Sequence, residues 1–551
     1  MVAEEGTPMS DEPRLETLLI GIDAGCLSVF DRLFDEERIP AIERICTEGT
    51  CTPLRSQIPP WTPSAWPSLY TGVNPGKHGV MGFVGYEGYD WHVVSHNDVR
   101  KPSLWELLSH HGMTSVVVNV PVTHPPRPFD GALIPGFIGP EDPECHPSGL
   151  LEDVRSAIGE YRVYPRYTRD SERLSGNEKM AEYETLIGMR GAAFRHLVND
   201  YTPEFGFLQF QKTDTVFHEF DGEETKVNRV YEAVDAEIEA ILDACRPRRV
   251  VLASDHGIGT YGRYEFRVNE FLRREGYVQA TNSGKGMPSW NPIRMELREG
   301  NRVSTWEPSR TERLAAGAAK FGLTARRARI VLEKLRLLGV VKRVVPSNVA
   351  RTANVQVDFE RSTAYMRTRT ELGVRLNLAG REPNGVVDRS AYESVRAQLI
   401  DLLADVETPD GEPVFADVCP REEYIDGDVA DDAVDIVTVP TDMNHFLSEQ
   451  LGDDLFGLPE ASWDHKLDGV FAAYGEGVDT DVHIEGAHLL DVAPTLLAAH
   501  GVPYSDRMDG AVLPIVDDPG SESYPARLGD AGDTGEVDDD VEERLADLGY
   551  L

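Results

Sequence analysis

The segment Arg249-Val-Val-Leu-Ala-Ser-Asp-His-Gly257 is the most informative part of this 551-residue chain. A run of apolar residues with strand character ends in two adjacent metal-ligand types, the carboxylate of Asp255 and the imidazole of His256. Gly257 then allows the backbone to turn sharply. Alone, such a tripeptide is a weak signal, because most Asp-His-Gly sequences are ordinary polar loops. Its weight depends on whether other strands end in the same way.

Two further apolar segments do end in an aspartate. Leu18-Leu-Ile-Gly-Ile-Asp23 opens the chain, and Phe205-Gly-Phe-Leu-Gln-Phe-Gln-Lys-Thr-Asp214 follows later, with His218 four residues on. In an open parallel α/β sheet, ligands collect at the carboxyl ends of the strands. Three strands that each deliver an aspartate to that edge therefore predict a metal centre.

Strand-like and helical segments alternate along most of the chain, which predicts an α/β fold: a mostly parallel sheet with helices on both faces. A single helix is expected near 28–48, followed by a loop at 52–62 and a helix near 63–71. The later strands are expected at 115–120, 205–213 and 248–254, with helices near 178–199 and 225–245. The alternation resumes with a strand near 374, a helix at 390–405, a strand at 469–474 and a closing helix up to His500.

The alternation of strand-like and helical segments is interrupted between about 281 and 375, where no clear pattern of this kind is visible. We expect residues 281–375 to be an inserted cap over the ligand edge of the sheet. The catalytic core is then predicted to comprise 15–280 and 376–515, and 516–551 to be an acidic C-terminal tail.

The chain carries a formal net charge of −40. Because the acidic residues are spread along the whole sequence, a solvating, salt-adapted (halophilic) surface is favoured over an acidic surface for binding a partner. The charge opposes general nucleic-acid binding, which needs a basic footprint. A small anionic substrate stays compatible, because bound divalent cations dominate the local field of a site.

The six cysteines show no Cys-x-x-Cys spacing, which favours a reduced compartment. The first seventeen residues are polar and acidic, and no stretch approaches the length of a membrane span. We expect a cytoplasmic protein without membrane contact, and the sequence leaves its oligomeric state open.

A second strong signal is the stretch from Pro59 to Gly79. Thr62 precedes Pro63, and proline is favoured at the first helical position, so Thr62 is expected to cap a helix. The positive helix end there would favour an alkoxide and an incoming anion. On this stretch alone an ordinary threonine cap is the favoured interpretation, because threonine becomes a nucleophile only with an activator such as a metal.

These motifs together resemble the type I phosphodiesterase/nucleotide pyrophosphatase branch of the alkaline phosphatase superfamily. The family opening, an Asp followed by Thr-x-Pro-Ala-Trp-x-Ser-x-x-Thr-Gly-x-x-Pro-x-x-His-Gly, corresponds here to Asp23, Thr62, Ala65-Trp66, Ser68, Thr71-Gly72, Pro75 and His78-Gly79. Ser64 stands where the family has proline, although the spacing from Thr62 to Thr71-Gly72 is intact. Asp214, His218, Asp255, His256 and the late His465 also match, and the similarity spans roughly 15–280 and 375–515.

The resemblance implies an alkaline phosphatase-like fold and two divalent metal ions. One would be held by Asp214, His218 and His465. The other would be held by Asp23, Asp255 and His256, with Thr62 as a further ligand. Two ions bring four positive charges, which three carboxylates and a threonine alkoxide would balance. A mixed Asp/His set suits zinc, with manganese as the second choice, and iron is not excluded.

The predicted cap contains a basic segment within an acidic chain. Ten Lys/Arg residues lie between Arg310 and Arg343, against only Glu312 and Glu333. A cap that guides an anionic substrate is one interpretation. A solvated helix face whose arginine stems are packed is somewhat favoured.

The sequence therefore predicts a metal-dependent hydrolase of phosphate esters, in particular phosphodiesters or nucleotide pyrophosphates, with Thr62 as nucleophile. A phosphomonoesterase or phosphomutase with the same site is the alternative among enzymes. A sulfatase is disfavoured, because Thr62-Pro63 offers no Cys/Ser-x-Pro-x-Arg motif. A metal-binding homologue without activity is the alternative of another class, although such a protein has no need of Thr62.

Overall fold

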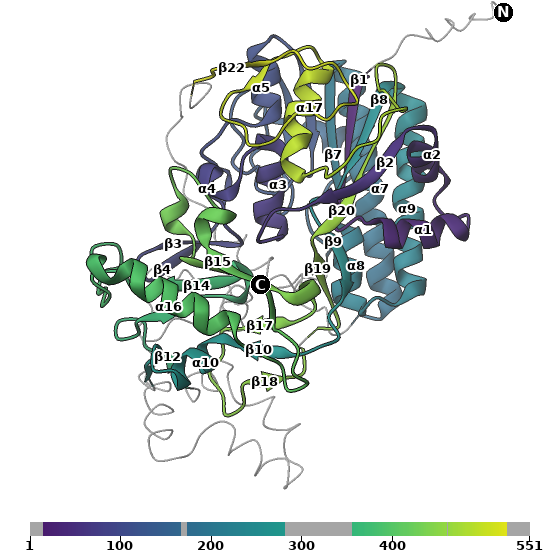
Figure 1. The fold of residues 1–551 in the computed structure, drawn as a ribbon. Coiled ribbons are helices and arrows are strands. Elements are labelled where there is room, and N and C mark those ends of the chain that lie inside the picture. Colours follow the sequence, from purple (N-terminus) through teal and green to yellow (C-terminus); the bar gives the residue numbers. More distant parts are fainter. Residues whose placement is uncertain (1–14, 167–173, 282–354, 460, 526–551) are drawn as a thin grey trace, which may run out of the picture.

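The computed structural model describes residues 15–166, 174–281, 355–459 and 461–525. Within them, a seven-stranded sheet has the order β2-β20-β8-β1-β7-β5-β6 (Figure 1). From β8 to β6 the neighbouring strands are parallel, whereas β20 runs antiparallel to β8 and β2 antiparallel to β20. The strands are β1 Leu15–Ile22, β2 Thr50–Arg55, β5 Ser115–Val118, β6 Gly131–Ile134, β7 Phe205–Phe210, β8 Pro247–Ala253 and β20 Asp468–Gly475.

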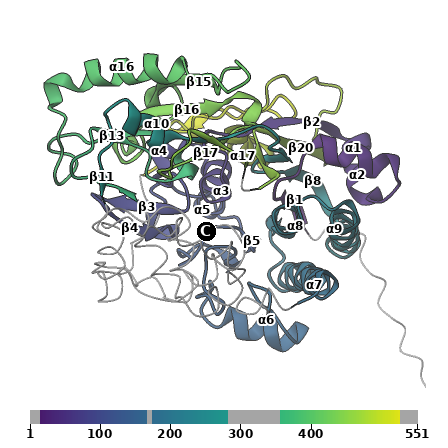
Figure 2. The same ribbon diagram turned by 90° about the horizontal axis from the view of Figure 1, so that it is seen from below.

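Helices cover both faces of this sheet, as the alternating sequence predicts (Figures 1 and 2). One face is covered by α1 Leu27–Asp35, α2 Pro40–Glu48, α6 Leu150–Ile158, α7 Gly176–Tyr201, α8 Lys212–Phe220 and α9 Glu224–Cys245. The other is covered by α3 Thr62–Thr71, α5 Leu104–His110 and α17 Val492–Ala499.

The strands have two buried faces because their side chains alternate between two hydrophobic cores. In β1, Leu18 and Ile20 pack into the core under α7 and α9, whereas Leu19 packs with α3 and α5 on the opposite face. Both kinds of position are fully buried, which explains why β1 is an almost continuous apolar run.

Beyond the carboxyl edge of the large sheet lies a second β structure, drawn in green in Figure 1. Its four antiparallel strands are β13 Ala364–Tyr365, β14 Gly373–Leu376, β16 Ile436–Pro440 and β15 Phe415–Pro420, and α16 Tyr392–Ala404 packs on β15. Three short strands, β17 Phe446–Ser448, β10 Glu265–Arg267 and β18 Phe456–Gly457, form a further sheet. The four-stranded sheet joins residues on both sides of position 375, and the division into core and cap stays a prediction.

The segment 281–375 and the tail 516–551 are only partly covered by the structure. The basic segment from Arg310 to Arg343 and its Lys/Arg residues lie outside the described residues. Of the tail, residues 516–525 are described, and β22 Ser521–Glu522 there pairs with β21 Tyr504–Ser505.

Three local predictions were wrong. The expected loop 52–62 begins with β2, an edge strand that tolerates Pro53 because the outer side of an edge needs no hydrogen-bond donor. The expected helix 28–48 is two helices, since Pro40 starts α2 and does not continue α1. The expected strand 205–213 ends at Phe210, which places Asp214 in the first turn of α8.

Candidate metal centre

The predicted site residues come from five places in the chain and meet at the carboxyl edge of the large sheet. Asp23 follows β1, Asp255 and His256 follow β8, and Thr62 begins α3. Asp214 and His218 are one turn apart on α8, the spacing that places two side chains on one helix face. His465 lies in β19, Trp463–Lys466, which pairs with β9, Gly257–Thr260, directly after the Asp-His-Gly segment.

One group of ligand atoms surrounds the start of α3. His256 Nε2 lies 3.1 Å from Asp255 Oδ2 and 3.6 Å from Asp23 Oδ1. Thr62 Oγ1 lies 3.2 Å from His256 Nε2 and 3.5 Å from Asp23 Oδ1. The structure therefore brings together Asp23, Asp255, His256 and Thr62, the set that the resemblance implies for one metal.

A second group lies beside it. His218 Nε2 is 3.1 Å from Asp214 Oδ1, and His465 Nε2 is 3.2 Å from His218 Nε2 and 3.6 Å from Asp214 Oδ1. The rings of His256 and His465 stack with centroids 3.7 Å apart, so the two groups are in contact. Asp214, His218 and His465 are the residues that the resemblance implies for the other metal.

The histidines are oriented in the way that metal ligands require. His256 Nδ1 donates to the carbonyl oxygen of Gly257 at 3.0 Å, and His465 Nδ1 donates to that of Pro60 at 2.8 Å. Committing Nδ1–H to a carbonyl leaves the Nε2 lone pair available, the arrangement typical of metal-bound imidazole. Asp255 Oδ2 is buried and accepts no hydrogen bond from the described residues. These donors fit a pair of divalent cations.

Asp23 is held on its far side by two side chains that the sequence analysis did not select. Gln209 Nε2 donates to Asp23 Oδ2 at 2.7 Å, and Trp66 Nε1 donates to the same oxygen at 3.3 Å. Asn119 Nδ2 in turn donates to Gln209 Oε1 at 2.9 Å. These bonds leave Oδ1 of Asp23 facing Thr62, so Gln209 and Trp66 fix which oxygen points into the site.

The backbone around Asp23 supports the same geometry. Ala24 has a φ of 57°, a left-handed conformation that is uncommon for alanine, and its N–H lies 3.3 Å from Asp255 Oδ1. Thr213 Oγ1 donates to the carbonyl oxygen of Asp23 at 2.6 Å, which ties α8 to the end of β1. Strained backbone of this kind is concentrated at functional sites.

Burial and charge shift the pKa values of the cluster strongly. Burial raises the pKa of Asp23 well above its ordinary value, and the carboxylates of Asp255 and Asp214 raise it further. Burial lowers the pKa of His465 far below that of free imidazole, and the neighbouring His256 and His218 act in the same direction. Burial also lowers the pKa of His218, but the charge of Asp214 outweighs it and brings that pKa to about 8. Cations in the cluster would relieve the repulsion between the carboxylates.

Thr62 is the first residue of α3, and the preceding Trp61 is its N-cap, without a side-chain capping bond. The expectation that Thr62 caps the helix through its side chain was therefore wrong by one position. Pro63 still lies in the first turn, where no N–H is needed. Since Thr62 makes no cap, its hydroxyl is directed to Asp23 and His256.

Ser64, the departure from the family motif, takes part in a buried hydrogen-bond network. Its Oγ donates to the carbonyl oxygen of Val80 at 2.7 Å and accepts from Gln57 Nε2 at 2.5 Å. Val80 N–H donates to His78 Nδ1 at 3.1 Å, and His78 Nε2 donates to Ser68 Oγ at 2.8 Å. His78 thus stabilises the turn after α3, and Ser64 links that turn to the helix.

Two residues near the cluster carry no strong sequence signal. Asp464 joins His218 and His465 in a group of ligand atoms that lie within 4.8 Å of one another. The ring of Trp61 lies 4.7 Å from that of His465, and its buried Nε1 donates to none of the described residues. Asp464 was visible beside His465 in the sequence, but only β19 brings it to His218.

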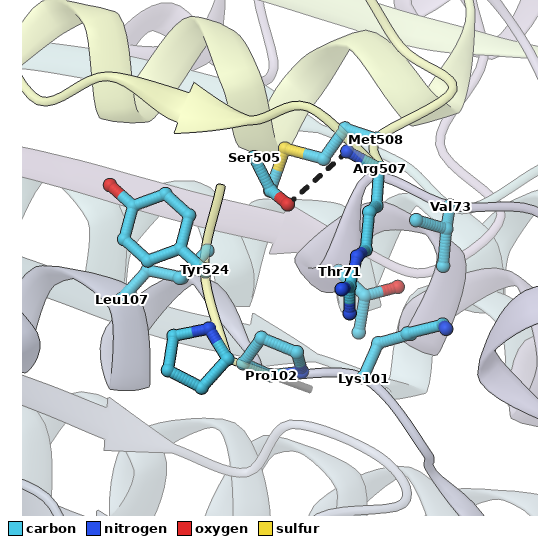
Figure 3. A pocket seen from close by; sticks show the side chains of 10 residues that line it. Thr71, Val73, Lys101, Pro102, Leu107, Ser505, Arg507, Met508 and Tyr524 are labelled. Carbon is cyan, nitrogen blue, oxygen red and sulfur yellow. Dashed lines mark hydrogen bonds between the residues drawn. The ribbon is translucent and has the colours of Figure 1, made fainter. Parts of the chain in front are cut away.

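The seven predicted residues differ in their exposure. Six are buried, whereas 17% of the His218 side chain is exposed. A small hollow at the opposite end of α3 is separate from this centre. Figure 3 shows Lys101 and Arg507 beside Thr71 there. Thr71 ends the ten-residue helix that Thr62 begins, about 14 Å away along the helix axis.

Comparisons with known proteins place these observations in context. The sequence profile of type I phosphodiesterases/nucleotide pyrophosphatases matches residues 17–327. A search of curated proteins found no match. Among solved structures, phosphonoacetate hydrolase from Sinorhizobium meliloti 1021 in complex with phosphonoformate is similar, with a TM-score of 0.50 and 15% identity over 87% of this chain and 94% of that one. The same enzyme in complex with phosphonoacetate gives a TM-score of 0.48, again at 15% identity and with the same coverage.

The profile match contains six of the predicted site residues, and His465 lies beyond it. At this identity the likeness to the solved structure concerns the fold alone. It agrees with the alkaline phosphatase-like architecture that the sequence resemblance implies. Among the described residues, no helix is both long and apolar enough to span a membrane.

Proposed function

Because the chain belongs to the type I phosphodiesterase/nucleotide pyrophosphatase family and is thus a hydrolase of phosphate esters, we propose that it cleaves phosphodiesters or nucleotide pyrophosphates at a two-metal site. The observation that carries the proposal is the position of Thr62. Its buried hydroxyl lies 3.2 Å from His256 Nε2 and 3.5 Å from Asp23 Oδ1, at the positive end of α3.

The proposed ligand sets are those of the two groups of side chains. Asp214, His218 and His465 would hold one divalent ion, and Asp23, Asp255, His256 and Thr62 the other. Bound zinc or manganese would supply the Lewis acidity that lowers the pKa of the Thr62 hydroxyl and stabilises charge on the phosphoryl oxygens. The ligand chemistry favours zinc, with manganese as the second choice.

In the proposed reaction, Thr62 Oγ1 attacks phosphorus as the ester bond to the leaving alcohol breaks. For a diester, the product of this step is a phosphorylated threonine that keeps the second ester group, and water then releases the phosphate monoester and regenerates Thr62. Trp61 and His465 pack beside Thr62 and help to keep bulk water from its hydroxyl.

The preference for diesters follows from the charges near Thr62. Enzymes that favour monoesters usually place an additional Arg or metal at the extra phosphoryl oxygen. Two arginines that could be considered for this role are engaged elsewhere: Arg55, the nearest to Thr62 in the sequence, pairs with Asp468 at 3.0 Å, and Arg381 pairs with Asp435 at 2.7 Å. A site in which two metals roughly balance their own ligands suits a singly charged diester.

The alternative is a phosphomonoesterase or phosphomutase, and Arg369 favours it. This arginine lies near enough to His218 for its charge to lower the pKa of that imidazole. If Arg369 reaches a phosphoryl oxygen, it would supply the charge that a monoester needs.

The test is the ratio of kcat/KM for bis-p-nitrophenyl phosphate and p-nitrophenyl phosphate, with zinc or manganese and high KCl. We expect a ratio well above one for the wild type. A ratio below one that Arg369→Met reverses would establish the monoester alternative.

Thr62→Ala tests the nucleophile in the same assay. Loss of the covalent route should lower kcat by at least about a hundredfold. Acid quenching during turnover of the diester should trap a p-nitrophenyl phosphoryl group on Thr62 of the wild type, detectable by peptide mass spectrometry. Turnover that survives Thr62→Ala at more than about a tenth of the wild-type rate would exclude Thr62 as the nucleophile. Absence of any turnover in the wild type would favour the inactive metal-binding homologue.

We also propose the domain division of the sequence analysis, with a catalytic core at 15–280 and 376–515, a cap at 281–375 and a tail at 516–551. The proposal is supported by β13, a described part of the cap, which belongs to the four-stranded sheet beyond the ligand edge of the large sheet (Figure 1), whereas β15 and β16 of that sheet come from 376–515.

A further inference from the structure

A second hollow lies next to the metal centre, at the same carboxyl edge of the sheet. It is a narrow hollow, partly open to solvent, that forms where β5 and β7 end and α7 crosses over them. Among the side chains that line it are those of Asn119, Arg190, Gln211 and Lys212. The strand ends of an open α/β sheet are where such folds bind their ligands.

The polar atoms of this hollow are mainly donors. Gln211 is only 7% exposed, and its Nε2 donates to no acceptor among the described residues. Lys212 Nζ donates to Gln211 Oε1 at 2.9 Å and lies 5.2 Å from the ring centroid of Tyr183. Arg190 donates to the carbonyl oxygens of Arg162 and Val163, the latter at 2.6 Å. The hollow thus offers an amide N–H, the side-chain nitrogen of Lys212 and a guanidinium.

Arg190 and Lys212 lack a paired carboxylate among the described residues, although each is only 4% exposed. Glu219, Asp214 and Asp23 act on Lys212 at longer range, and Glu141 acts on Arg190, while Glu219 is itself bound by Lys179 and Tyr183. A buried cation that is bound only by neutral groups is costly, and an anion bound by these two side chains would offset that cost. The positive end of α8, which begins at Lys212, adds to the attraction.

The hollow and the metal centre share a wall. Asn119 donates to Gln209, and Gln209 donates to Asp23, so only two hydrogen bonds separate the hollow from a proposed metal ligand. Lys212 precedes Asp214 by two residues on α8. Because Gln209 binds Oδ2 of Asp23, the oxygen that faces away from Thr62, the hollow lies behind this proposed metal ligand.

We propose that the hollow binds a small oxyanion, of the carboxylate or phosphate type, through Gln211 Nε2, Lys212 Nζ and the guanidinium of Arg190. The oxyanion is either a free inorganic anion or a second anionic group of the substrate. In the second case the inference rests on the proposed function and narrows the substrates to phosphate esters that carry another negative charge.

A matched pair of substrates tests the second source. 4-Nitrophenyl carboxymethyl phosphate and 4-nitrophenyl methyl phosphate differ only by one carboxylate. If the hollow holds that carboxylate, the holoenzyme should prefer the carboxymethyl ester by about tenfold or more in kcat/KM, the value expected for hydrogen bonds to a charged group. Gln211→Leu should reduce the ratio of the two kcat/KM values toward one.

Calorimetric titration with sulfate at constant high KCl tests the free anion. The wild type should show a binding event that Gln211→Leu weakens by about tenfold or more. Lys101→Met is the matched control in both assays, because Lys101 lies in the separate basic hollow of Figure 3, and it should change neither result.

Gln211→Glu provides a second variant in case Gln211→Leu fails to fold. It keeps the size of the side chain but places a negative charge among the donors, and it should repel the anion more strongly than leucine does. If the variant loses the wild-type preference for the carboxymethyl ester, the hollow binds the second anionic group of the substrate. If the wild type shows no such preference but the variant loses sulfate binding, the hollow binds a free anion. If the wild type shows neither, the inference is overturned. If the wild type cleaves neither ester, the proposed function is contradicted. The sulfate titration would still show whether the hollow binds an anion.

Discussion

His465 donates a hydrogen bond from Nδ1 to the carbonyl oxygen of Pro60, across 2.8 Å and 405 positions of sequence. The bond joins the late histidine to the loop that enters α3, two residues before Thr62. It also turns His465 Nε2 toward His218 and Asp214. A single contact thereby fixes the position of a proposed metal ligand relative to the proposed nucleophile.

Metal removal should abolish activity, and metal analysis of the active protein should approach two ions per chain, because the side chains form two adjoining ligand groups. Asp255→Asn and His465→Ala should each lower the bound metal, since each removes a ligand from a different group. His110→Ala, at an exposed position, is the control and should retain full occupancy. Full activity with one ion per chain would contradict the two-metal site.

Gln209→Leu should weaken metal binding without removing a ligand, because it frees Asp23 Oδ2 to rotate toward the site. Loss of such an outer partner typically lowers metal affinity by about 10- to 100-fold. The dissociation constant can be measured by competition with a chromogenic chelator, independently of turnover. Gln398→Leu, on the exposed face of α16, should leave the constant unchanged. An unaltered affinity in Gln209→Leu would show that Asp23 needs no such support.

The melting temperature should rise between about 0.1 M and about 2 M KCl. The net charge of −40 opposes the compact state through mutual repulsion, and salt screens it as the Debye length falls from about 10 Å toward about 3 Å. A parallel series with sucrose separates screening from general solute exclusion. A melting temperature that stays level or falls with KCl would show that the acidic surface serves another purpose.

His78 should make the fold sensitive to acid. Burial lowers the pKa of His78 from 6.5 to about 3, so between these values the unfolded chain binds a proton that the folded chain does not. The free energy of unfolding should therefore decrease as the pH falls below about 6.5, by at most about 1.4 kcal/mol per pH unit for this residue.

The comparison of His78→Asn with wild type by urea unfolding between about pH 7 and about pH 5 isolates this contribution. The variant is expected to be less stable at neutral pH but to lose less stability on acidification. His483→Asn, at an exposed position, should follow the wild-type pH profile. Equal slopes for His78→Asn and wild type would mean that His78 takes up its proton without unfolding.

The sequence by itself determined the fold class and the order of the proposed ligands. Both depend on local patterns: an apolar run makes a strand, and a polar residue directly after it lies at the carboxyl edge of the sheet. Asp23, Asp255 and His256 could be selected in this way, and so could Asp214 with His218 four residues on, although the structure places both on α8 and not at a strand end. The same local reasoning failed for Thr50–Arg55, because an edge strand with one buried side chain, Leu54, lacks a clear apolar pattern.

Only the tertiary structure decided which residues support the ligands and what lies beside them. Gln209 is separated from Asp23 by 186 positions, and its partner Asn119 comes from a different strand. Neither has a recognisable motif, since a polar side chain within an apolar strand gains its role only from the strand packed next to it. The donor-rich hollow arises in the same way, because α7 brings Arg190 over the strand ends that carry Asn119 and Gln211. The residues at the strand ends can be recognised from the local sequence. Their hydrogen-bond partners across the sheet cannot, because these depend on how the strands and helices pack.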